Sequence, residues 1–308
     1  MELRRLELFA LVAELGSLSK AAKAADMAQS LVSRNIAQLE QEWGDRLFQR
    51  TGRGVVLSDF GRRVQPDIQL LLDQAERLRS AVKEAAGVPT GTVHIGILPS
   101  MSRILVARLF ADMQITAPAV RLHFIEGFSG YLDEQLLSGR LDFAIINRYG
   151  PSPERGEDVL GYVHTYLIGT SANTFADGKT IAFKQLAHLP LVLPGAPNGL
   201  RSILDQYSRQ QGIRLNVALE VDTLSAMKDV ALSGAAFTIL PLLAVSQEVA
   251  EGRLTALKIA SPAIRRTIAL SITKQRPLSR AARLTVTRIR TLATELLHSV
   301  EGSATPST

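Results

Sequence analysis

Polar side chains whose chemistry suits the reading of DNA bases cluster in one short amphipathic segment. They are Gln29, Ser30, Ser33 and Arg34. Glutamine can pair with adenine, arginine with guanine, and serine with several base edges or with phosphate. Val32, Ile36 and Leu39 recur at spacings of four and three, which places them on the opposite face of a helix. An isolated helix of this kind is more often an ordinary solvated surface, so the interpretation depends on its neighbours.

The elements that precede this helix have the pattern of a helix-turn-helix. A first helix is expected over residues 3–15, and Ser17 or Ser19 can cap a second, short helix rich in alanine. A turn at residues 25–28 then leads into the polar helix. Two helices joined in this way present the second one to a DNA groove. Ser19 and Ala28 therefore join the residues expected to contact DNA.

Two short extended runs follow over residues 47–57, on either side of a glycine-rich turn. This pattern predicts a β-hairpin wing. At its tip Arg50, Thr51 and Arg53 can grip the DNA backbone or enter the minor groove; the alternative is a surface hairpin whose arginines are solvated. Between residues 46 and 63 five arginines face a single aspartate, a local excess that suits phosphate contacts.

A long helix is expected after Ser58, which can serve as its N-cap. Apolar residues spaced by four and three form a heptad seam along it: Val64, Ile68, Leu71, Ala75, Leu78 and Val82. Such a seam suits pairing with the same helix of a second chain, although a short one can also pack on its own domain. Pro66 should delay the start of the paired part, and the breakers in residues 87–91 form a linker.

Composition excludes several classes of protein. The sequence has 308 residues, 46% of them hydrophobic, and no cysteine, so we expect about two globular domains without disulfides or thiolate metal sites. The five histidines show no ligand spacing, and we expect neither a metal nor a cofactor. No apolar run is long enough to span a membrane and no signal-peptide core follows Met1, which favours the cytoplasm.

The formal net charge of +6 does not by itself indicate DNA binding. Residues 264–308 hold eight Lys or Arg against two Asp or Glu and so carry the whole excess, far in sequence from the polar helix. The pattern of residues 284–296 predicts a last helix packed on the C-terminal domain. The small polar residues 301–308 are expected to form a disordered tail.

From residue 92 onward extended and helical runs alternate, as in α/β units with parallel sheets. The expected strands are 93–98, 120–125, 143–146, 162–168, 191–193, 217–221, 237–240 and 267–272. Ligands of open α/β sheets bind beyond the carboxyl ends of strands, where helix starts and hydroxyl groups suit an anion such as a carboxylate. The residues expected to contact a ligand there are Ser100, Met101, Ser102, Phe128, Asn147, Arg148, Asn198, Arg201 and Thr223. Each serine can equally cap a helix, and each arginine can be a surface ion-pair partner.

Four motifs in the N-terminal block resemble those of the LysR-type transcriptional regulators. They are SLSKAA at 17–22, VSRNIAQLE at 32–40, LFQR at 47–50 and LSDFG at 57–61. The resemblance extends in organisation through the whole chain. One departure is Ala28-Gln29-Ser30, where the family often has Ser-Gln-Pro, and the loss of cap and proline costs about 1 kcal/mol at the helix start unless Asp26 or Ser30 compensates.

The resemblance implies a fold of the α/β class with an N-terminal all-α winged helix-turn-helix and a two-lobed, periplasmic-binding-protein-like effector domain. The implied domains are 1–60 for DNA binding, 61–90 for the dimerisation helix and hinge, and 91–300 for effector binding, with lobes of about 91–162 plus 268–300 and 163–267 joined by crossing strands. Ser100, Ser102 and Asn198 match positions that often touch the inducer in the family. The implied partners are double-stranded promoter DNA, a small-molecule effector, RNA polymerase and further copies of the chain in a homodimer or homotetramer.

Three functions compete on these observations. An enzyme is disfavoured because the chain has no Gly-x-Ser-x-Gly, no Gly-Lys-Ser/Thr phosphate loop and no His-Glu-x-x-His. A solute-binding protein would explain the two lobes but would have no use for residues 1–86. A bacterial transcription regulator that responds to an anionic effector in the cleft between the lobes accounts for every segment, and this is the expected function.

Overall fold

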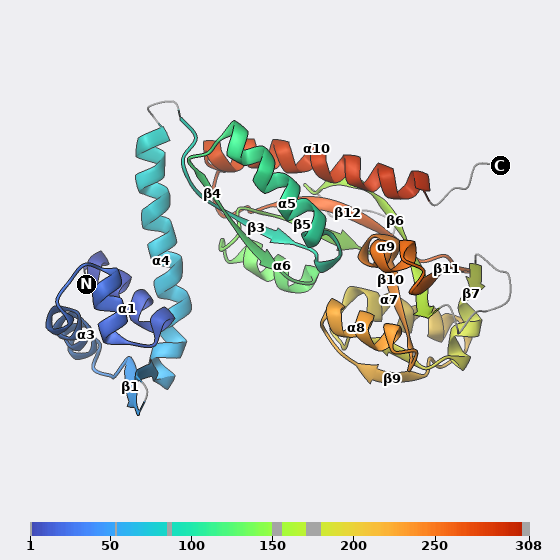
Figure 1. The fold of residues 1–308 in the computed structure, drawn as a ribbon, viewed down its shortest axis with the longest axis horizontal. Coiled ribbons are helices and arrows are strands. Elements are labelled where there is room, and N and C mark those ends of the chain that lie inside the picture. Colours follow the sequence, from blue (N-terminus) through green and yellow to red (C-terminus); the bar gives the residue numbers. More distant parts are fainter. Residues whose placement is uncertain (1, 53, 85–87, 150–155, 171–179, 304–308) are drawn as a thin grey trace. The chain divides into compact units, whose positions relative to one another are not determined.

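The computed structural model describes residues 2–52, 54–84, 88–149, 156–170 and 180–303. The chain divides into two compact units, Met1–Val88 and Pro89–Thr308. Figure 1 labels the elements of both units, and each unit is described here by itself.

The N-terminal unit is a winged helix-turn-helix followed by a long helix. Its elements are α1 (Leu3–Leu15), α2 (Leu18–Ala24), α3 (Gln29–Trp43), β1 (Phe48–Thr51), β2 (Gly54–Leu57) and α4 (Asp59–Glu84). The Ser17 side chain accepts a hydrogen bond from the Lys20 N–H and caps α2, which leaves Ser19 free for another contact. Phe9, Val32 and Leu39 are buried in one core between the helices. The expected helix positions are therefore confirmed.

The start of α3 lacks a side-chain cap. Ala28 occupies the N-cap position, and neither Asp26 nor Ser30 compensates for it. Asp26 instead adopts a left-handed backbone with φ of 51° in the turn between the two helices. Because aspartate tolerates this conformation better than most residues, it suits the turn.

The wing is a two-stranded antiparallel hairpin in which Phe48 pairs with Leu57 and Thr51 with Gly54. The Val55 N–H donates to the carbonyl oxygen of Gly16 at 2.9 Å, which fixes the hairpin against the end of α1. Gly54 has φ of 148°, and a Cβ there would overlap the Gly16 carbonyl oxygen. A glycine is required at this close approach.

Helix α4 begins after Ser58, whose hydroxyl accepts from the Gly61 N–H at 2.9 Å as an N-cap. The expected seam divides into two parts. Val64 and Ile68 pack into the core of the same unit, so pairing with a second chain is the wrong role for this half. Leu78 and Val82 are each 69% exposed and face no core. The helix continues through Pro66, and the exposed part lies after it.

The C-terminal unit consists of two α/β lobes. The first sheet has the order β4 (Val120–Glu126), β3 (Gly91–Ile97), β5 (Phe143–Arg148), β12 (Arg265–Ile272) and β6 (Asp158–Thr170). The second adds β10 (Phe237–Pro241), β8 (Leu191–Leu193) and β9 (Val217–Glu220) to β6, with β11 (Leu254–Ala260) and β7 (Thr180–Ala182) on its other side. All eight expected strands are present, whereas β7 and β11 were missed.

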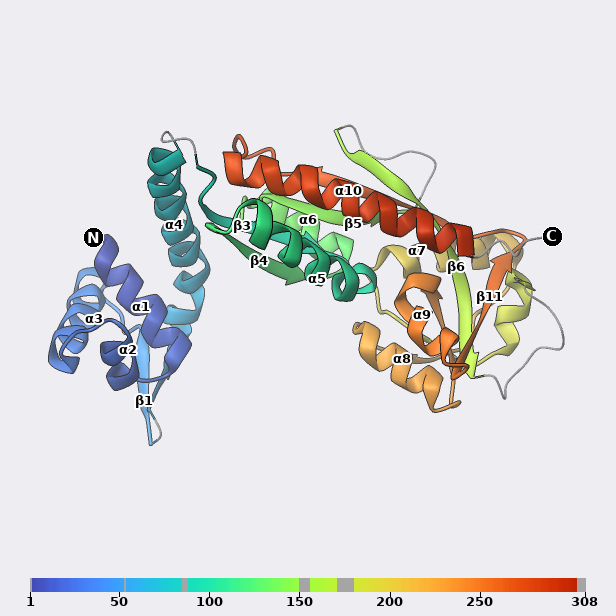
Figure 2. The ribbon, with the colours of Figure 1, turned by 45° about the horizontal axis from the view of Figure 1, so that its top comes forward.

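Strand β6 belongs to both sheets, as Figure 2 shows. Up to His164 it pairs with β12 in the first lobe, and from Thr165 onward it pairs with β10 and β11 in the second. The chain returns at the start of β12, where Ile264 packs in the core of the second lobe and Ile268 in that of the first. The two lobes are therefore joined by β6 and by the segment that leads into β12.

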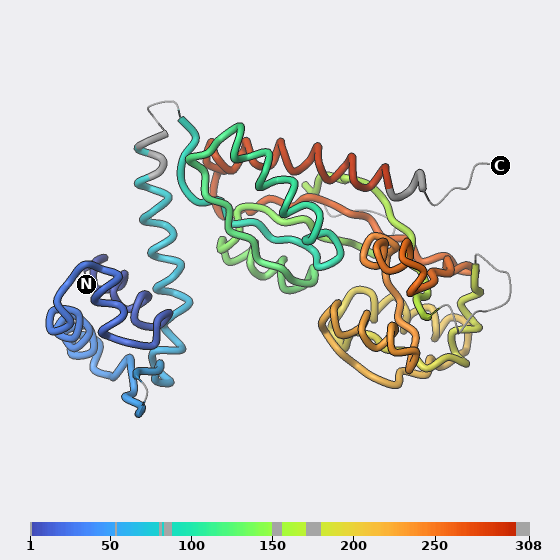
Figure 3. Tube along the Cα trace, viewed as in Figure 1, coloured from blue at the N-terminus to red at the C-terminus, as the bar shows by residue number. Residues whose placement is uncertain are grey.

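Helices cover the sheets. They are α5 (Pro99–Thr116), α6 (Ser129–Leu137), α7 (Gly199–Gln211), α8 (Leu224–Leu232), α9 (Leu242–Ala250) and α10 (Arg280–Ser303), with a short 3-10 helix at Phe183–His188. Figure 3 shows the red trace of α10 beside the green trace of α5, and both helices bury apolar residues in the core of the first lobe. Because α10 reaches Ser303, the tail expected from residue 301 starts too early; residues 304–308 lie outside the described residues.

Candidate functional site

A cavity of about 710 Å³ lies between the two lobes. The helices α5, α6 and α7 all begin at its wall, so their first N–H groups and their positive dipole ends are directed toward it. Apolar side chains from both lobes line much of the rest, among them Phe128, Ile203, Met227 and Ile239. The cavity therefore offers a wall of helix N-termini together with an apolar interior.

Arg266, at the point where the chain crosses back into the first lobe, is the residue that sequence reasoning missed. It lines the cavity although only 7% of the residue is exposed. Its Nη2 donates to the Ser100 hydroxyl at 3.1 Å, and it also hydrogen-bonds with Tyr149. Its Nε is buried without a hydrogen-bond partner, and no ion pair of Arg266 with a carboxylate occurs among the described residues.

Burial is the largest influence on the pKa values of both Arg266 and Tyr149. Desolvation lowers the pKa of the Arg266 guanidinium below its usual value, and the neighbouring Tyr149 opposes that effect. Burial raises the pKa of the Tyr149 phenol, so this side chain stays neutral at physiological pH. Because an arginine retains its proton in proteins, the cavity is lined by a buried cation that has no carboxylate partner among the described residues, which favours an anionic ligand.

Five of the nine expected ligand residues line the same cavity, among them Ser100, Phe128 and Asn147. The Ser129 hydroxyl, which was not expected, accepts from the Asn147 N–H at 2.9 Å and donates to its Oδ1 at 3.0 Å. Asn198 also lines the cavity, but its Oδ1 caps α7 by accepting from the Leu200 N–H at 2.9 Å. These contacts fix the orientation of both asparagines.

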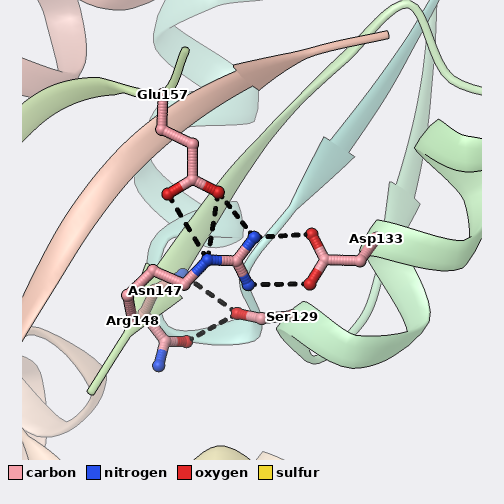
Figure 4. Close-up of polar contacts among 5 residues, drawn as sticks. All are labelled: Ser129, Asp133, Asn147, Arg148 and Glu157. Carbon is pink, nitrogen blue, oxygen red and sulfur yellow. Dashed lines mark hydrogen bonds and ion pairs between the residues drawn. The ribbon is translucent and has the colours of Figure 1, made fainter. Parts of the chain in front are cut away.

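Arg148 lines the cavity but is already engaged by two carboxylates, as Figure 4 shows. Its Nη1 and Nη2 donate to the two oxygens of Asp133 at 2.7 and 2.8 Å. Glu157 accepts from Nε at 3.0 Å and from Nη2 at 2.6 Å. These bonds raise the pKa of Arg148 above its usual value. The expected contact of Arg148 with a ligand therefore stays a prediction, because the residue lines the cavity but already donates from Nε, Nη1 and Nη2 to neighbouring carboxylates.

Four other expected ligand residues lie away from this cavity. Met101 is 1% exposed because it faces the core of the first lobe. The Ser102 hydroxyl donates to Glu126 and lines no described cavity. Arg201 forms ion pairs with Asp205 and Glu220 on another surface. Thr223 lines a smaller adjoining cavity of about 410 Å³. A position near a strand end in the sequence does not predict whether a side chain faces the cavity, the core or another surface.

The expected DNA-contacting residues that the structure describes lie on α2, on α3 and its start, and on the wing. Gln29, Ser30 and Arg34 are exposed on α3, Ser33 is half-buried, and Ala28 is exposed at the helix start. The Ser19 hydroxyl donates to Gln29 Oε1 at 2.9 Å, which orients that amide. Arg50 and Thr51 are exposed on the wing, and Arg53 lies outside the described residues.

Two family models match the chain. Residues 3–62 match the bacterial regulatory helix-turn-helix protein of the lysR family, and residues 86–294 match the LysR substrate binding domain. The chain therefore belongs to the LysR-type family of transcriptional regulators, and it is a DNA-binding regulator with an effector-binding domain. Its relatives are regulators and not enzymes or solute-binding proteins.

Curated relatives agree with this assignment, and a solved structure shares the fold. The regulator BbuR of Bordetella bronchiseptica is 28% identical over 254 residues, which are 82% of this chain and 77% of that protein. The nitrogen assimilation regulatory protein Nac of Klebsiella aerogenes is 25% identical over 91% of each chain. Full-length CbnR in complex with its target DNA shares the fold, with a TM-score of 0.69, 20% identity, and coverage of 95% of this chain and 100% of that one.

Within the part of the chain that the structure describes, no helix is long and apolar enough to cross a membrane, and no group of three or more His, Cys, Asp or Glu side chains could hold a metal ion.

Proposed function

We propose that this regulator responds to a small anionic effector that binds in the cleft between the lobes, with Arg266 as its anchor. The observation that carries the proposal is the buried Arg266, which lines the cavity and has no carboxylate partner among the described residues. Burying a charge without a counterion costs free energy. A bound anion would supply that counterion to Arg266. Ser100 and the start of α5 supply further donors for the same anion.

Thermal melting of the full chain tests this proposal. Hexanoate, octanoate and benzoate are the probes, and at least one should raise the melting temperature in a concentration-dependent manner because a ligand that binds only the folded state stabilises it. The matched controls are the uncharged amides of the same acids, which keep the apolar body but lack the anion. Equal shifts by an acid and its amide would show that the cleft does not recognise the charge.

We propose that α3 reads the major groove and that the wing contacts the DNA backbone. Arg34→Ala should cost about 1 to 3 kcal/mol of DNA-binding free energy and relax base preference at one position of each half-site, because an arginine–guanine pair contributes about that much. The measurement is a titration of the variant against a set of single-base operator variants. A uniform loss on all sequences would show that Arg34 holds only phosphate.

Oligomerisation and polymerase contact complete the proposed mechanism. The exposed half of the α4 seam pairs two chains, so that two copies of α3 reach the half-sites of an inverted repeat, and effector domains associate into a homotetramer. Effector binding changes the activity at the promoter, including contact with RNA polymerase, only if the effector binds two arrangements of the protein with different affinity. Arg266 suits that role because it lies where the chain crosses between lobes.

A further inference from the structure

The charged side chains that line the cleft differ in whether the protein already supplies a partner of opposite charge. Among the described lining residues the cations are Arg148 and Arg266, and the anions are Asp133 and Asp222. Asp222 accepts from the Gly195 N–H at 3.0 Å and so remains at the wall of the second lobe. Of these two cations only Arg266 has no carboxylate partner among the described residues, whereas Arg148 has two.

The second cation is held by carboxylates on two sides. Asp133 and Glu157 both form ion pairs with the Arg148 guanidinium. The Glu157 side chain is only 5% exposed and the Arg148 side chain 19%. Because water screens charges less where they are partly buried, a second anionic group of a ligand would have to compete with these ion pairs for Arg148.

We infer that the cleft selects a ligand with one anionic group and an apolar body, and that Asp133 and Glu157 enforce this choice by occupying Arg148. The inference rests on the proposed binding of an anion at Arg266. A second carboxylate on the ligand would lack a free cation and would approach Asp133, which itself lines the cavity. An uncharged body instead contacts apolar side chains such as Phe128, Met227 and Ile239.

The direct test compares mono- and dicarboxylates of equal length on the full chain by calorimetric titration at neutral pH. The pairs are hexanoate with adipate and octanoate with suberate. Each monocarboxylate should bind at least about tenfold more tightly than its partner, the ratio that corresponds to about 1.4 kcal/mol. Equal or tighter binding of the dicarboxylates would overturn the inference while leaving the proposed anion site in place.

A substitution tests whether the carboxylates set this preference. Asp133→Asn keeps the shape of the side chain but removes one of the two carboxylates that hold Arg148, so the preference for the monocarboxylate should fall about tenfold, mainly through tighter binding of the dicarboxylate. Glu134→Gln is the matched control, because it removes the neighbouring, exposed carboxylate of α6. An unchanged ratio in Asp133→Asn would refute the assigned role.

Two further outcomes separate this inference from the proposed function. If no acid binds the unaltered chain, or if binding survives Arg266→Met at full strength, the anion site itself is refuted and the inference fails with it. If Asp133→Asn does not fold, as judged from its melting curve, Glu157→Gln makes the same change of charge from the opposite side of Arg148. An unchanged preference in that variant would overturn the inference equally.

Discussion

Leu78→Glu should leave the N-terminal unit folded, abolish pairing of the chains through α4 and weaken operator binding by about a hundredfold or more. Leu71 is 39% exposed, and Leu78 and Val82 are each 69% exposed. Their spacings of seven and four place the three residues on one stripe of the helix. A buried carboxylate at the centre of that stripe would lose its hydration without gaining a partner. Two linked α3 helices bind an inverted repeat with avidity, which a single chain lacks.

Light scattering and operator titration on the same samples measure both effects. Gln65→Glu is the control, because it places the same charge on an exposed position of α4 that lies off the stripe. Its mass and its DNA affinity should match those of the unaltered chain. A Leu78→Glu variant that keeps its oligomeric mass would show that another surface joins the chains, and one that is monomeric but binds DNA normally would show that pairing through α4 is dispensable.

The heptad seam illustrates how far sequence pattern reaches. Its period correctly predicts one apolar stripe along α4, because a helix places residues four and three apart on the same face. The pattern does not say what the stripe contacts. Ile68 is buried and Val64 half-buried against the core of the same unit. That packing depends on where the chain folds back against the helix. The spacing of apolar residues along the helix does not predict which other elements the helix packs against.

For the cleft, too, the sequence predicts some features and not others. Alternation of strands and helices predicts the lobes and the strand ends at which a ligand binds, because these follow from local periodicity and the chirality of α/β units. It does not predict which arginine is free. Arg148 is occupied by side chains nine and fifteen positions away, and Arg266 meets Ser100 across 166 positions. Strand β11 is not predicted from the sequence, because its apolar residues do not alternate regularly with polar ones.

Arg266→Met should lower the affinity for the stabilising carboxylate by about 2 to 5 kcal/mol, the usual cost of deleting one partner of a buried, hydrogen-bonded charge pair. At the ligand concentrations that stabilise the unaltered chain, the melting temperature should no longer respond. Operator binding without effector should persist because α3 and the wing are untouched. Arg266→Lys keeps the charge but loses the planar fork, so its affinity should fall between the two.

The same variant should be at least as stable as the unaltered chain when no ligand is present. Burial lowers the pKa of Arg266, which means that the folded state disfavours the charged form, and this cost disappears when an apolar side chain of similar length replaces it. Arg265→Met is the control: Arg265 is exposed and stacks on Tyr162 with its guanidinium carbon 4.0 Å from the ring centre, so its loss should leave effector affinity unchanged. A protein that lost stability with Arg266→Met but kept its effector response would show that this guanidinium supports the fold and not the ligand.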